Sequence, residues 1–173
     1  MKGFTLIEVL IITFIISFLS VAILINYRSS QDQAFLTRAA AAFESEIRRT
    51  QNLAVAGTEF SGVIPCGYGL NYRDNKAYRI YVGQLGGAAN CQSSNHNYQS
   101  GLDSDYQDLK IIESGVVFIN SFSDIFFEPP DPATYINNNK LAGVSTIIQF
   151  CLEKDLTICR SLIIDTAGRI SIQ

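Results

Sequence analysis

The chain has 173 residues, with 13 Lys and Arg against 16 Asp and Glu, and a net charge of −3. This length allows one domain plus an additional segment, and the mildly acidic balance argues against general binding to nucleic acid or anionic lipid. The 4 Cys are even in number, so we expect two disulfides in an exported domain. Patterns typical of a catalytic nucleophile or a phosphate-binding loop are absent, and no enzymatic activity is predicted.

The first predicted element is an apolar helix with a single acidic residue. Between Phe4 and Ile25 the only charge is Glu8, and there is no Pro or Gly. Leu, Ile, Phe and Val each contribute about 0.3–0.6 kcal/mol toward membrane insertion, and together they outweigh about 2.5–3.5 kcal/mol for one buried charge. We therefore expect residues 4–27 to insert into a membrane, where Glu8 needs a partner.

The residues before this helix are short and basic. Residues 1–3 read Met-Lys-Gly and residues 4–8 read Phe-Thr-Leu-Ile-Glu, which resembles the leader and helix start of the type IV prepilins. The resemblance implies that a prepilin peptidase cuts after Gly3 and N-methylates Phe4. It also implies that Glu8 pairs with the terminal amine of a neighbouring subunit at an inner-membrane assembly platform. Many type IV pilins have Pro where this chain has Ile25.

Two other interpretations of the N-terminal segment stay open. An ordinary signal peptide would be cut after Ala22, which ends a small-x-small pattern, although Glu8 is out of place in a signal core. A plain signal anchor would keep Met1, and Glu8 would then be incidental. Either case would make the protein an exported, disulfide-bonded binding domain.

Residues 28–56 are predicted to continue the helix with an amphipathic pattern. Gly57 is the expected C-terminal stop, and at about 1.5 Å per residue one helix over residues 4–56 would reach about 80 Å. The apolar stripe consists of Leu36, Ala40, Phe43, Ile47 and Ala54, widened by Phe35, Ala39 and Ala42. This stripe is expected to pack on a β-rich head formed by residues 57–173.

The head begins with a predicted hairpin. Period-two alternation at 66–72 and 78–82 flanks a polar turn at 73–76. A long polar loop at 84–108 follows, then weak strands at 111–112, 116–119 and 125–127, and loops at 128–132 and 137–139. The predicted fold is α+β, with a long N-terminal helix packed on one antiparallel sheet of about five strands.

The end of the chain predicts a three-strand meander and the disulfide pairing. A hairpin folded about Asp155 places Cys151 opposite Cys159, which leaves Cys66 to pair with Cys91 and pin the long loop. Free thiols or a single disulfide are the alternatives. The same register pairs Gln149 with Ser161, Glu153 with Thr157 and Phe150 with Arg160.

A second turn at 165–169 is expected to place Gly168 in the left-handed conformation. This turn would pair Ile164 with Ile170, Leu162 with Ile172 and Asp165 with Arg169. Residues 164–170 read Ile-Asp-Thr-Ala-Gly-Arg-Ile, and a helix followed by short strands with this ending looks like the minor pilins and H-type pseudopilins.

The long loop contains two polar groups that are candidate sites. His96, the single His, lacks a Ser or Cys context that resembles a nucleophile motif and is predicted to be solvated. Asp103, Asp105 and Asp108 could ligate calcium, which some pilins and pseudopilins bind in their heads. The stretch lacks the Gly and terminal Glu of an EF-hand loop, so a solvated acidic turn is favoured and no cofactor is expected.

The predicted function is a structural subunit of a type IV pilus-like filament. The protein would first cross the cytoplasmic membrane once, with its head outside the cytoplasm, and would then join an extracellular or periplasmic filament with other pilin or pseudopilin subunits. A competence minor pilin that binds DNA is an alternative, which the scattered basic residues of the head disfavour. Those residues are Arg73, Lys76, Arg79, Arg160 and Arg169.

Overall fold

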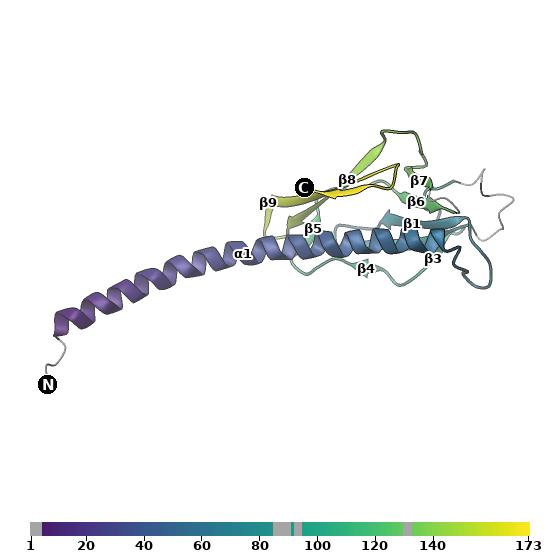
Figure 1. Cartoon of the computed structure of the whole chain (residues 1–173). Helices are drawn as coiled ribbons and strands as arrows, with labels where there is room; N and C mark the ends of the chain where they lie inside the picture. Colours follow the sequence, from purple (N-terminus) through teal and green to yellow (C-terminus); the bar gives the residue numbers. More distant parts are fainter. Residues whose placement is uncertain (1–4, 85–90, 92–94, 130–132) are drawn as a thin grey trace. The chain divides into compact units, whose positions relative to one another are not determined.

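The computed structural model has an α+β fold in which an N-terminal helix is followed by antiparallel sheets (Figure 1). It describes residues 5–84, 91, 95–129 and 133–173. The chain divides into two compact units, residues 1–35 and 36–173. The predicted α+β class and the antiparallel pairing are confirmed.

Helix α1 covers Leu6–Val55 and ends as the sequence predicts. Gly57 has a φ of 56°, so it takes the left-handed conformation that a residue without a Cβ adopts at low cost. The amide of Gly57 donates to the carbonyl of Ala54 and the amide of Thr58 donates to the carbonyl of Leu53. These two bonds form a Schellman motif, which satisfies carbonyls that the helix leaves free.

Ten strands, counted over the described residues, form two antiparallel sheets where the sequence predicted one. The six-stranded sheet has the order β3-β2-β1-β6-β7, with β4 also paired to β2, and the four-stranded sheet has the order β10-β9-β8-β5. The bounds are β1 Gly67–Tyr72, β2 Ala77–Gly83, β3 Ser104–Asp105, β4 Lys110–Ile111, β5 Val116–Phe118, β6 Ile125–Glu128, β7 Ala133–Ile136, β8 Ser145–Leu152, β9 Asp155–Asp165 and β10 Ile170–Ile172.

The main core lies where residues 36–55 of α1 meet both sheets. The Phe43 ring contacts Tyr78 of β2 at 4.8 Å and Phe150 of β8 at 5.5 Å, both edge to face. Such pairs contribute beyond the apolar area that they bury. The predicted stripe is confirmed at Leu36, Ala39, Ala40, Phe43, Ile47 and Ala54, all of which are buried, whereas Ala42 is exposed.

The opposite face of the six-stranded sheet is also covered, which the sequence did not predict. Gly67 and Gly69 leave room there, because a Cβ on Gly69 would lie 2.5 Å from the Tyr81 ring and one on Gly67 would lie 2.7 Å from the Phe126 ring. Tyr81, Phe126 and Tyr135 form a buried group on this face, with Tyr98 packed against it. We call these four residues and His96 the second aromatic cluster.

The C-terminal meander is confirmed in most of its register. Phe150 pairs with Arg160, Gln149 with Ser161, Ile164 with Ile170 and Leu162 with Ile172. The predicted pairing of Glu153 with Thr157 is wrong, because a bulge after Cys151 pairs Leu152 with Asp155 and tightens the turn. Gly168 has a φ of 73°, as expected for this turn.

Strand β7 was missed, because residues 128–139 contain several Pro and Asn residues that favour loops. It forms a hairpin with β6 that pairs Phe126 with Tyr135. At the end of β7, Asn137 and Asn138 have φ values of 50° and 59°, and the amide of Asn139 donates to the carbonyl of Ile136. This two-residue turn has the left-handed central residues of type I′, which Asn tolerates.

Candidate functional site

The start of α1 places Glu8 in a local hydrogen-bonding arrangement. One Glu8 carboxylate oxygen accepts the Thr5 amide at 2.9 Å and the Thr5 hydroxyl at 2.8 Å. The Glu8 amide in turn lies 3.4 Å from the Thr5 hydroxyl oxygen. This is a capping box, in which an N-cap Thr and a Glu three residues later satisfy free amides of the first turn.

The capping box gives Glu8 a role that sequence reasoning missed. The signal was present in the chain, since Thr-x-x-Glu before an apolar run is the pattern of such a cap. The expected partner, the amine of a processed Phe4, and the expected cut after Gly3 both lie outside the described residues. Glu8 therefore has a demonstrated contact within its own chain, and its contact with another subunit stays a prediction.

Around Glu8 the helix carries large apolar side chains that are exposed in the described part of the chain. Leu6 is 84% exposed, Phe14 is 70% exposed and Phe18 is 69% exposed. A monomeric soluble protein rarely leaves a contiguous apolar surface of this kind in water. Other exposed residues of the same stretch are Ile7, Val9, Leu10, Ile11, Ile12, Ile15, Ile16, Leu19, Val21 and Ile23.

A search of the described residues for a helix that could span a membrane finds none.

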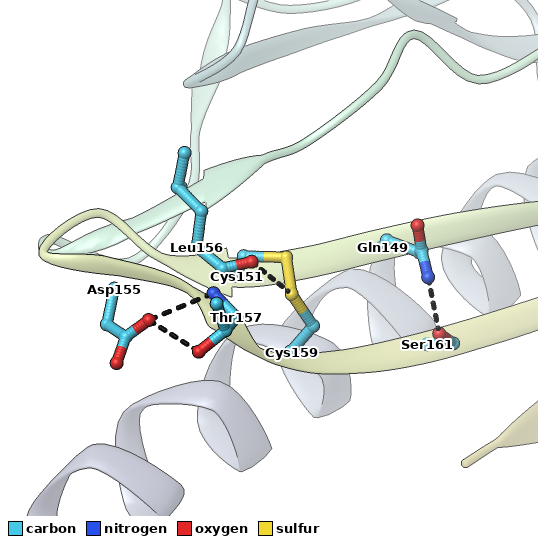
Figure 2. The surroundings of a disulfide bond; sticks show 7 residues. All are labelled: Gln149, Cys151, Asp155, Leu156, Thr157, Cys159 and Ser161. Carbon is cyan, nitrogen blue, oxygen red and sulfur yellow. Dashed lines mark hydrogen bonds between the residues drawn. A yellow bond between two sulfur atoms is a disulfide. The ribbon is translucent and has the colours of Figure 1, made fainter.

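The two cystines form as the sequence predicts. Cys66 is bonded to Cys91, and Cys151 is bonded to Cys159 across β8 and β9. Figure 2 shows the second cystine beside the β8–β9 turn, where the Asp155 carboxylate accepts the amide of Thr157 at 3.0 Å and its hydroxyl at 2.6 Å. These bonds favour the ionised form and hold the pKa of Asp155 below its usual value.

His96 is not solvated, so that prediction is wrong. Its side chain is buried in the second aromatic cluster, where the ring stacks on Tyr135 with centroids 3.6 Å apart. The Tyr81 hydroxyl donates to the His96 carbonyl at 2.6 Å. The sequence could not indicate this, because the residues that cover His96 come from strands far away along the chain.

The three candidate calcium ligands, Asp103, Asp105 and Asp108, form no metal-binding group. Asp103 is buried and accepts the amides of Gln99 at 2.6 Å and Gln84 at 3.2 Å, whereas Asp105 lies 3.5 Å from Arg79. Across the described residues there is no group of three or more acidic, His or Cys side chains that could hold a metal ion. Asp108 is exposed.

Asp103 and Asp124 instead anchor the segment of residues 95–105 to the six-stranded sheet. The Asp124 carboxylate accepts the side-chain amide of Asn71 and the backbone amide of Tyr98, both at 2.7 Å. Burial raises the pKa of Asp103 and of Asp124, and the hydrogen bonds to each carboxylate lower it in part. Both carboxylates therefore have structural partners already.

Comparisons of the chain with protein-family models, with curated proteins and with solved structures find no match.

Proposed function

We propose that this protein is a non-catalytic subunit, a minor pilin or a pseudopilin, of a type IV pilus-like filament. In this proposal a prepilin peptidase removes residues 1–3, residues 4–27 hold the subunit in the cytoplasmic membrane, and the head lies outside the cytoplasm. The subunits then leave the membrane when their helices pack against one another in an extracellular or periplasmic filament.

The observation that carries the proposal is the combination of Glu8 with the uncovered apolar surface around it. Burying one Leu, Ile or Phe side chain contributes about 1.5–3 kcal/mol, so packing the helices of several subunits together would supply a large driving force. A carboxylate enclosed by that packing is costly without a cation. The amine of a neighbouring Phe4 would supply the cation and would also fix the register between two subunits.

The capping box allows a test that separates charge from helix capping. Glu8→Gln keeps a side chain that can cap the helix but removes the charge, Glu8→Ala removes both, and Thr5→Val removes the hydroxyl alone. If Glu8 pairs with an amine, both Glu8 variants enter the filament poorly and Thr5→Val enters normally. The measurement is the amount of subunit in the sheared filament fraction relative to the membrane fraction.

Glu44→Gln is the matched control, because Glu44 is a carboxylate of the same helix that contacts Arg48 at 2.7 Å. It should enter the filament like the unaltered protein. Normal entry of Glu8→Gln together with failure of Thr5→Val would mean that Glu8 serves only as a helix cap, and the pairing mechanism would be rejected.

The alternative of an exported binding domain on a plain anchor is separated by sequencing the N-terminus of the mature protein. A methylated Phe4 supports the filament proposal, whereas a start at Ile23 or an intact Met1 contradicts it. The DNA-binding alternative has less support, because most of the basic side chains named for it have partners within residues 36–173. Lys76 contacts Glu153 at 2.6 Å, Arg169 contacts Asp165 at 2.7 Å, Arg79 contacts Asp105 and Arg160 contacts Thr37.

A further inference from the structure

The hydrogen-bond partners of His96 define which nitrogen of its ring carries a proton. The backbone amide of His96 donates to Oδ1 of Asn138 at 3.1 Å, so the atom at that position is an oxygen and not the amide nitrogen. The ring atom Nδ1 lies 2.7 Å from the same oxygen. An oxygen acceptor at this distance requires a proton on Nδ1.

With Nδ1 protonated, a neutral ring would leave Nε2 as a bare acceptor. Nε2 is buried and has no hydrogen-bond donor among the described residues. The polar atom that faces it is Oε2 of Glu128 at 3.8 Å, itself an acceptor, which takes the Tyr135 hydroxyl at 2.7 Å. If His96 is neutral, Nε2 is a buried acceptor without a donor, and it also faces a second acceptor, the Glu128 carboxylate. Each of these two features is unfavourable in a buried site.

A protonated His96 resolves both conflicts at once. Nε2 then becomes a donor within ion-pair distance of the Glu128 carboxylate, and the parallel Tyr135 ring at 3.6 Å offers its negative face to the imidazolium. Phe126 packs at 5.1 Å and excludes water from another side. The opposing contribution is the desolvation of the cation, which the carboxylate offsets.

The other ionisable groups near His96 come from each element of the second aromatic cluster. Tyr81 of β2 bonds to the His96 carbonyl, and burial raises the pKa of Tyr81 so that it stays neutral. Tyr135 of β7 also has a raised pKa because of burial. Two like charges lie beside the cluster: Lys140 is 5.5 Å from the Tyr135 ring, and Arg79 of β2 is 4.2 Å from the Tyr98 ring. Glu128 of β6 is the facing anion.

We infer that His96 is a proton-operated clasp: its imidazolium, paired with Glu128 and stacked on Tyr135, fastens residues 95–97 to the β6–β7 hairpin. The clasp holds more firmly when the ring is protonated and loosens when the ring is neutral. Asn97 extends the contact, since its side-chain amide donates to Asn137 at 3.0 Å. This inference concerns the head alone and does not depend on the filament proposal.

The experiment uses the full-length protein in detergent, with ¹⁵N-labelled histidine. His96 is the single His of the chain, so its ring signals are unambiguous. As the solution is acidified, the ring should change from the Nδ1-protonated tautomer to the imidazolium. The protection of the His96 backbone amide against hydrogen exchange should rise about tenfold as the ring becomes charged, because the charged ring gains an ion pair with Glu128.

Glu128→Gln tests the anion. The Gln amide can donate to Nε2 and satisfy the neutral ring, so the rise in amide protection on acidification should disappear in this variant. Glu153→Gln is the control, because Glu153 is an exposed carboxylate that pairs with Lys76 away from the cluster. This control should keep the full response.

Three results would overturn the clasp: an Nε2-protonated tautomer at high pH, amide protection that does not change with pH, or an unchanged response in Glu128→Gln. If Glu128→Gln does not fold, the tautomer and the amide protection of the unaltered protein still decide the question.

Discussion

The two stretches of helix α1 use apolar side chains in opposite ways. In residues 36–55 the apolar residues keep to one stripe, and Leu36, Phe43 and Ile47 are at most 1% exposed because the sheets cover them. In residues 6–21 apolar residues lie on all sides, and Leu6 and Phe14 remain 84% and 70% exposed. A stripe specifies packing on one surface, whereas an apolar helix without a polar face requires surroundings that enclose it. The difference separates a part of the helix that stabilises the head from a part whose apolar side chains are left exposed.

The strongest test of this comparison exchanges an aromatic ring for Ala in each stretch. Phe43→Ala removes the ring at the centre of the core and should lower the free energy of unfolding by about 3–5 kcal/mol. Phe14→Ala, the matched control, should leave that quantity unchanged. Denaturant unfolding of the full chain in detergent, followed by near-ultraviolet circular dichroism, gives both values. Equal losses in the two variants would contradict the division of roles.

Both cystines lie in the unit of residues 36–173, which contains the buried core, so their removal should lower the stability of that unit. Replacing Cys66 and Cys91 with Ser opens a closure of 25 residues, and replacing Cys151 and Cys159 opens one of 8 residues. Chain entropy then predicts losses of about 3.5 and about 2.5 kcal/mol respectively. The same denaturant measurement checks the order of the two losses, and a larger loss for the shorter closure would contradict the entropic account.

The buried carboxylates of the head give the smallest expected effect. Burial raises the pKa of Asp103 and Asp124 above the ordinary value of 3.8, so the folded state binds more protons than the unfolded state in that range. Their contribution to stability is complete below this value and is lost as pH rises through the raised folded values. Asp124→Asn should therefore flatten the fall in unfolding free energy across this acidic range. A fall as steep as that of the unaltered protein would show that Asp124 is not responsible.

Local patterns predicted much of the fold correctly. The spacing of apolar residues placed the stripe of α1, Gly57 marked the helix end, and alternation with turn residues gave the register that joins Cys151 to Cys159. These features depend on neighbours within one hairpin or a few helical turns. The predicted pairing of Glu153 with Thr157 is wrong because a bulge shifts the register after Cys151. The alternation of apolar and polar residues does not reveal such a bulge.

Contacts between distant segments could not be predicted in the same way. Strand β7 forms because β6 offers a pairing edge, and this contact overrides the loop preference of the Pro and Asn residues around it. Likewise His96 is buried by Tyr135 and Phe126, which lie some distance further along the chain. Only the folded chain brings these groups together.

The sequence by itself determined the α+β class, the apolar helix with Glu8, the end of α1 and the pairing of the four Cys residues, because each depends on periodicity, turn chemistry or register. The tertiary structure decided that the head has two sheets, that both faces of the six-stranded sheet are covered, and that His96 faces Glu128. The physical reason is that burial and electrostatic partners are set by whichever segments meet in space, and a local pattern carries no information about segments far along the chain.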